Sequence, residues 1–134
     1  MRVFLCAFAG FSLAIPMRSV SSIALYGEES PEVARVTLQR LFNLPEENIR
    51  HSVFLRGSDE DDSHSTENKV TLLTSEVECE AEIPDEEIFP LPKILEGTRF
   101  SMFFSGIQMD SLPRLVLNSE QLVQSIRRNE VAYD

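Results

Sequence analysis

The sequence is poor in the residues on which most catalytic and metal sites depend. It has no tryptophan, two histidines and two cysteines among 134 residues. Cys6 and Cys79 are far apart in sequence and form no C-x-x-C pair, which excludes zinc-ribbon and thioredoxin-type sites. A single disulfide between them is compatible with the sequence, but two reduced thiols are the simpler interpretation and fit a cytoplasmic protein.

Positive charge is also scarce. Twelve Lys and Arg residues stand against 22 Asp and Glu residues, which gives a formal net charge of -10. Such a surface repels nucleic-acid backbones and anionic membranes, so we expect neither as a partner. The N-terminal apolar run ends near Pro16 and is too short for a membrane-spanning helix. A hydrophobic fraction of 43% supports a packed core, and the length predicts a single domain over residues 1–134.

Recognisable catalytic and metal motifs are absent as well. The sequence contains no G-x-S-x-G, P-loop, G-x-G-x-x-G or H-E-x-x-H pattern. His51 flanks a predicted strand and is interpreted as a solvated strand-edge residue. His64 lies in an acidic segment, residues 57–68. Counted from Asp59, a calcium loop would need glycine at the sixth position and glutamate at the twelfth, where this sequence has His64 and Val70. We therefore expect a solvated loop there, and no catalytic residue, metal or cofactor.

Short apolar segments recur about every ten residues with turn signals between them, which is typical of an all-β barrel or sandwich. The run before Pro16 also resembles a signal peptide, but the central Gly10 favours a β-hairpin. Asn118 is positioned to cap a short C-terminal helix with Leu122, Val123 and Ile126 as its apolar stripe. The predicted strands are residues 3–9, 12–16, 20–26, 35–44 (ending in a helical turn), 50–56, 69–74, 99–107 and 112–117.

Four glutamates alternate with smaller or apolar residues in one stretch. The alternation predicts that all four lie on one face of a strand, where they protect an exposed sheet edge. A catalytic carboxylate pair would instead need a buried cleft with two different environments. The four residues are Glu76, Glu78, Glu80 and Glu82.

The order of these pieces resembles the CheW family of chemotaxis coupling proteins. Residues 3–20 resemble the family's opening hairpin, and residues 31–45 resemble its I-P-V-V-D-L-x-x-L-x-G-L-P strand and turn. Residues 70–77 are similar to its G-L-L-V-D-x-V strand, residues 82–92 to the following link, and residues 115–122 to its L-L-L-D-L-x-x-L ending. The chain departs from the family pattern at residues 26–30, where the family has a helix and an N-L-R-G segment.

The resemblance implies two small β-barrels packed side by side and a non-enzymatic adaptor without a cofactor. It implies binding to the regulatory domain of a CheA-type histidine kinase, to the cytoplasmic tip of a chemoreceptor, or to both. The family's partner-facing positions fall on Val20, Ser22 and Val77. Because the N-L-R-G segment is missing, an alternative is a CheW-like interaction module outside the receptor–kinase array. Such a module would bind a different partner or pair with itself through a strand edge.

Overall fold

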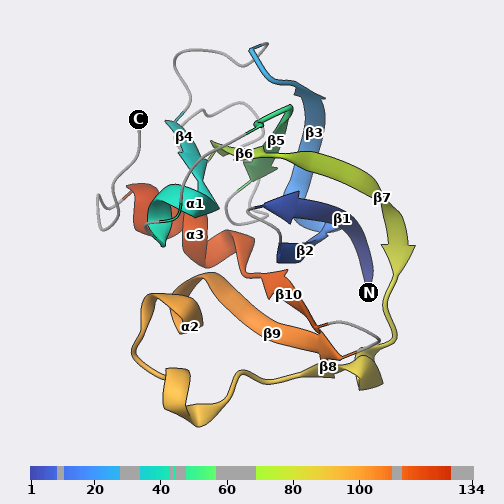
Figure 1. Cartoon of the computed structure of the whole chain (residues 1–134), viewed down its shortest axis with the longest axis vertical. Coiled ribbons are helices and arrows are strands. Elements are labelled where there is room, and N and C mark those ends of the chain that lie inside the picture. The colour runs from blue at the N-terminus through green and yellow to red at the C-terminus, as the bar shows by residue number, and fades with distance from the viewer. Residues whose placement is uncertain are drawn as a thin grey trace.

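Two β-sheets make up most of the structure (Figure 1). The computed structural model describes residues 1–8, 11–27, 34–42, 44, 48–56, 69–109 and 113–127. The strands are β1 (Arg2–Phe8), β2 (Phe11–Pro16), β3 (Val20–Leu25), β4 (Ala34–Thr37), β5 (His51–Arg56), β6 (Lys69–Thr74), β7 (Glu76–Glu82), β8 (Ile88–Phe89), β9 (Phe104–Met109) and β10 (Pro113–Leu117). The helices are η1 (Met17–Ser19), α1 (Leu38–Leu41), η3 (Asp85–Glu87), η4 (Lys93–Leu95), α2 (Arg99–Phe103) and α3 (Ser119–Arg127).

The chain passes between the sheets twice. The six-stranded sheet has the order β7-β1-β2-β10-β9-β8, and the four-stranded sheet has the order β3-β5-β6-β4. After β2 the chain crosses through η1 into β3, and it returns where β6 runs into β7 with only Ser75 between them. Pairing is antiparallel except for β2 with β10 and β4 with β6. The two sheets are therefore covalently joined at two places, which lie toward opposite ends of β1.

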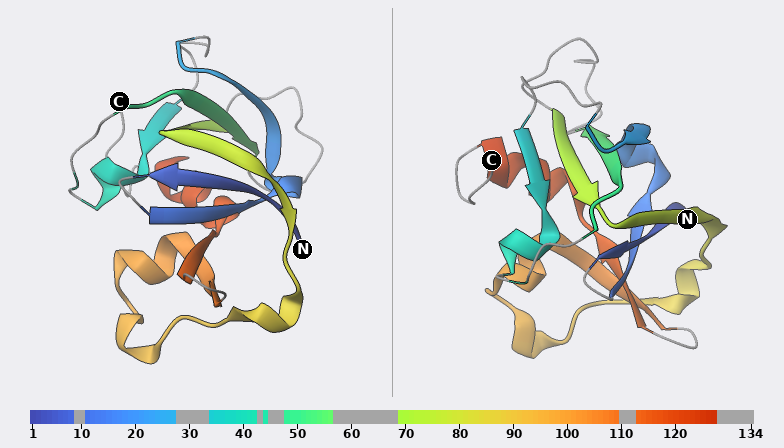
Figure 2. Two further views of the ribbon diagram at one scale, coloured as in Figure 1. Left: turned by 45° about the vertical axis from the view of Figure 1, so that its right-hand side comes forward. Right: turned by 45° about the horizontal axis from the view of Figure 1, so that its top comes forward.

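The six-stranded sheet curls around a small core of its own. Its two edge strands, β7 and β8, are consecutive in the chain and are linked through η3 along the side of the molecule (Figure 2). The buried members of this small core are Val3, Ala14, Ile83 and Val116. In the described residues no ladder joins β7 to β8, so the sheet is curled without closing into a barrel.

The larger core lies between the two sheets, where α3 is inserted (Figure 1). Leu122, Val123 and Ile126 of α3 are buried there, as the sequence predicted. The strands contribute alternate residues to the same core, as expected when one face of each sheet is buried. Those buried strand residues are Cys6, Leu13, Ile15, Val20, Val36, Val53, Leu55, Val70, Leu72, Phe104 and Leu117.

Side-chain caps start two of the described helices. Thr37 Oγ1 accepts a hydrogen bond from the Arg40 amide at 3.0 Å, which ends β4 and starts α1. Asn118 Oδ1 accepts from the Gln121 amide at 3.1 Å and starts α3. Each bond satisfies an amide that has no partner within its helix. The predicted strand-to-helix change within residues 35–44 and the predicted cap at Asn118 are both confirmed.

The prediction of one strand over residues 99–107 is wrong in its first half. Residues Arg99–Phe103 form α2, and β9 begins only at Phe104. The apolar residues at positions 100, 103 and 104 have the i, i+3, i+4 spacing of a helix, which the strand interpretation overlooked. Gly97, with a φ of 80°, provides the turn before α2.

The mostly-β prediction with short helical turns and a short C-terminal helix is confirmed. The two expected subdomains are present as a curled six-stranded sheet and a four-stranded sheet, and in the described residues neither sheet closes into a barrel. The acidic segment of residues 57–68 and the missing family segment near residues 28–30 lie outside the described residues.

Gly106 provides a test of the contact between β8 and β9. A Cβ atom at this position would lie 2.8 Å from the Phe89 carbonyl oxygen and 3.1 Å from Ile88 Cγ2. Because the first atom is backbone, Gly106→Ala must displace β8, and we expect a loss of about 1–3 kcal/mol in unfolding free energy. Urea unfolding followed by circular dichroism measures the loss. Ser105→Ala, at the exposed neighbour, should change it by less than about 0.5 kcal/mol; equal effects of the two variants would contradict the close approach.

Candidate protein-interaction surfaces

Strand β3 forms an edge of the four-stranded sheet and carries two of the predicted site residues. Val20 lies opposite Leu55 of β5, is 8% exposed and packs into the larger core. A β-bulge follows it, and Ser22 then lies opposite Phe54. Because directly opposed residues point to the same face, Ser22 faces away from the core and is exposed. The bulge therefore places Val20 and Ser22 on opposite faces of one strand.

Val77, the third predicted site residue, lies on β7 at an edge of the six-stranded sheet. It is opposite Cys6 of β1, is partly buried and packs against the same larger core as Val20. The structure thus brings Val20 and Val77 into one core from two different sheets. It places Ser22 on the solvent-facing side of β3.

Two exposed apolar side chains continue β3 beyond Ser22. Leu25 is 61% exposed, and Tyr26, whose amide donates to the Arg50 carbonyl oxygen at 2.9 Å, is 50% exposed. Gly27, with a φ of 99°, then turns the chain. The sequence predicts both as ordinary residues of a strand over residues 20–26. The sequence signal that could have indicated an exposed apolar pair was an apolar and an aromatic residue directly before a turn glycine.

The described edge strands differ in their charge. Strand β3 has no charged residue and forms an edge of its sheet over six residues. Strand β7 carries four exposed glutamates, β4 is four residues long and includes Arg35, and β8 is two residues long. Charge and shortness are the usual protections against unwanted strand pairing. β3 is therefore the longest uncharged edge in the described part of the chain.

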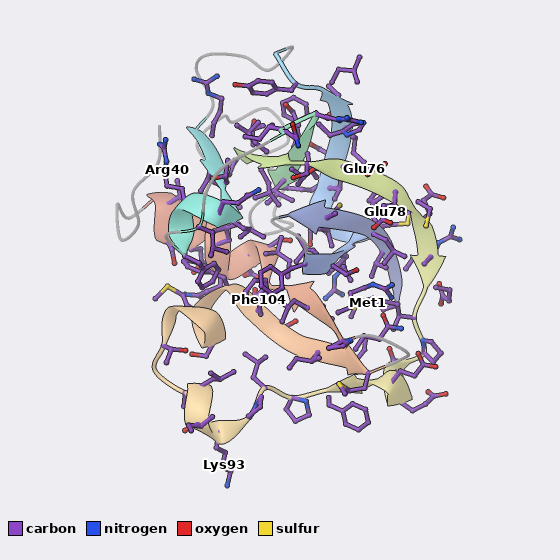
Figure 3. All side chains as sticks on the ribbon, viewed as in Figure 1. Met1, Arg40, Glu76, Glu78, Lys93 and Phe104 are labelled. Carbon is purple, nitrogen blue, oxygen red and sulfur yellow. The ribbon has the colours of Figure 1, made fainter. Side chains whose placement is uncertain are left out.

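The four glutamates of β7 do not form one row. Glu80 and Glu82 lie opposite Phe4 and Arg2, but a bulge in the β1–β7 pairing follows, and Glu76 lies opposite Ala7. The bulge changes which face later residues occupy, so Glu76 lies on the other face from Glu80. All four are exposed, and Glu76 and Glu78 project from the side of the molecule in Figure 3. The predicted edge protection is confirmed, and the predicted single face is wrong.

The same bulge separates the two thiols. Cys6 lies opposite Val77 and is fully buried, whereas Cys79 lies opposite Leu5 and is exposed. Leu5 and Cys6 are neighbours on a strand, so the two cysteines face opposite sides of the sheet. Both are free, as the sequence analysis preferred. Burial, assisted by the negative charge of Glu78, raises the pKa of the Cys6 thiol from 9.0 to about 12.

A groove of about 700 Å³ lies beside β3, where the two sheets meet the start of α3. Its charged side chains are Arg18 of η1, Arg56 at the end of β5, and Glu120 in the first turn of α3. Arg56 Nη2 donates to the Val20 carbonyl oxygen at 3.5 Å, which connects the groove to β3. The remaining lining residues are Met1, Pro16, Ser19, Ser105, Leu117, Asn118 and Ser119.

No metal-binding cluster is present in the described residues. No three His, Cys, Asp or Glu side chains gather there in a way that could hold an ion.

His51 is not the solvated edge residue expected from the sequence. It is partly buried at the start of β5, a central strand, and its Nδ1 atom is buried without a hydrogen-bond partner. None of the described helices has the length and apolarity that crossing a membrane requires.

The different environments of the two cysteines predict different thiol reactivity. The thiolate is the reactive species, and burial keeps Cys6 protonated at neutral pH. At pH 8 we expect the folded protein to react rapidly with one equivalent of a disulfide reagent such as DTNB, and with two in denaturant. Cys79→Ser should abolish the reaction of the folded protein. Rapid reaction of this folded variant would show that Cys6 is accessible.

Solved structures identify the fold. No protein-family model and no curated protein sequence matches the chain. The crystal structure of the scaffolding protein TtCheW from Thermoanaerobacter tengcongensis matches it with a TM-score of 0.65. The match has 13% sequence identity and covers 87% of this chain and 88% of that one. The chain therefore has a CheW-like fold over most of its length.

Proposed function

We propose that this protein is a cytoplasmic, non-enzymatic adaptor that couples chemoreceptors to a CheA-type histidine kinase in chemotaxis signal transduction. The observation that carries the proposal is the near-complete structural match to a CheW scaffolding protein. It is supported by the absence of recognisable catalytic motifs from the sequence and of a metal-binding cluster from the described residues. A strongly acidic chain also favours protein partners over nucleic acids.

The proposed partner-binding surface is centred on β3. Ser22 contacts the partner, while Val20 and Val77 support the surface from the larger core. Leu25 and Tyr26 extend the surface with exposed apolar area of the kind that supplies anchors in protein interfaces. The uncharged edge of β3 leaves backbone donors and acceptors available to a partner strand or loop.

This surface makes a matched test of the proposal possible. We expect the parent protein to bind the regulatory domain of the CheA-type kinase from the same cell, or its chemoreceptor tips, with micromolar affinity. Tyr26→Ala should weaken that binding by about 1–2 kcal/mol. Phe89→Ala is the control, because Phe89 is equally exposed at 50% but lies on β8 of the other sheet. Isothermal titration calorimetry measures the affinity of each variant for the partner. Ser22→Arg should weaken this binding in the same way as Tyr26→Ala.

Circular dichroism accompanies each titration. The exposed positions should leave the spectrum unchanged, whereas Val20→Asp would bury a charge in the core and is unsuitable as a binding probe. Absence of binding to both kinase and receptor tips by the folded parent would exclude the coupling role. Self-association that Tyr26→Ala abolishes would instead support the alternative interaction module.

A further inference from the structure

The groove beside β3 concentrates positive charge on an acidic protein. Arg18 and Arg56 both line it and are exposed, although the chain carries a net charge of -10. In the described part of the chain neither guanidinium forms an ion pair, and the hydrogen bond from Arg56 to the Val20 carbonyl uses only one of its donors. Glu120 is the one acidic residue among those that line the groove.

The start of α3 adds further donors to the same groove. Asn118, Ser119 and Glu120 line it, and Asn118 Oδ1 already caps the Gln121 amide. The amides of Ser119 and Glu120 belong to the first turn and therefore have no partner within the helix. Ser119 is only 3% exposed, and its Oγ atom has no hydrogen-bond partner. A buried hydroxyl without a partner is unfavourable, and a ligand in the groove would offer it one.

We propose that this groove binds an acidic segment of a partner protein. Carboxylates of the segment pair with Arg18 and Arg56, and one carboxylate accepts hydrogen bonds from the first turn of α3. The site is distinct from the β3 surface and does not require that the partner be a kinase or a receptor. Its size favours a peptide segment over a lone anion, because a volume of about 700 Å³ greatly exceeds that of one phosphate.

The test uses the whole chain and a peptide of six glutamates with blocked ends. We expect calorimetric binding that weakens as salt is added, and changes in the NMR signals of the Ser119 and Glu120 amides. The double variant Arg18→Gln/Arg56→Gln should weaken binding about tenfold. Glu120→Gln should strengthen binding about twofold, because it removes the opposing charge from the groove.

The matched control is Arg2→Gln/Arg40→Gln, which removes the same two charges elsewhere. Arg2 lies 3.9 Å from Glu80 in an exposed pair, and Arg40 lies across the molecule from Met1, which lines the groove (Figure 3). This variant should bind the peptide within about twofold of the parent. The proposal is overturned if the control loses as much affinity as the groove variant. It is also overturned if a six-glutamine peptide binds equally well, or if inorganic phosphate binds and the acidic peptide does not.

Discussion

The insertion of α3 between the two sheets is the interaction on which the rest of this structure depends. Its buried stripe of Leu122, Val123 and Ile126 contributes to a core that receives side chains from both sheets. Burying three such side chains contributes several kcal/mol, at about 1.5–3 kcal/mol each. The same packing fixes where α3 begins. The Phe103 carbonyl oxygen accepts a hydrogen bond from the Asn118 amide at 2.8 Å, and Phe103 is followed directly by β9. The groove at the start of α3 is therefore held by the core.

Aromatic packing extends this core to α1. Phe42 stacks on Phe104 with ring centroids 5.8 Å apart, and meets Phe103 edge to face at 6.1 Å. Phe104 lies near the centre of the molecule in Figure 3. Phe103 ends α2 and Phe104 starts β9, and both side chains are buried where the backbone changes from helix to strand. Local strand propensity did not indicate this boundary.

The sequence predicted the fold better than it predicted the orientation of the candidate site residues. The cap at Asn118 follows from residue type, and the α3 stripe follows from its spacing. The two bulges have no comparable signal, since Ser21 and Glu78 are ordinary strand residues. Each bulge reverses the inward and outward alternation. That reversal determines which of Val20 and Ser22 reaches solvent, and it places the glutamates of β7 on two faces.

The edge strands of the two sheets differ in charge. Acidic side chains protect β7, while β3 has no charge at all and ends in two exposed apolar residues. An unprotected edge is a liability unless a partner covers it, so the contrast favours β3 as the interaction edge. Arg56 connects this edge to the basic groove, because its side chain lines the groove and donates to the carbonyl of Val20. A carboxylate in the groove would pair with the remaining donors of the same guanidinium, so one side chain contributes to both proposed surfaces.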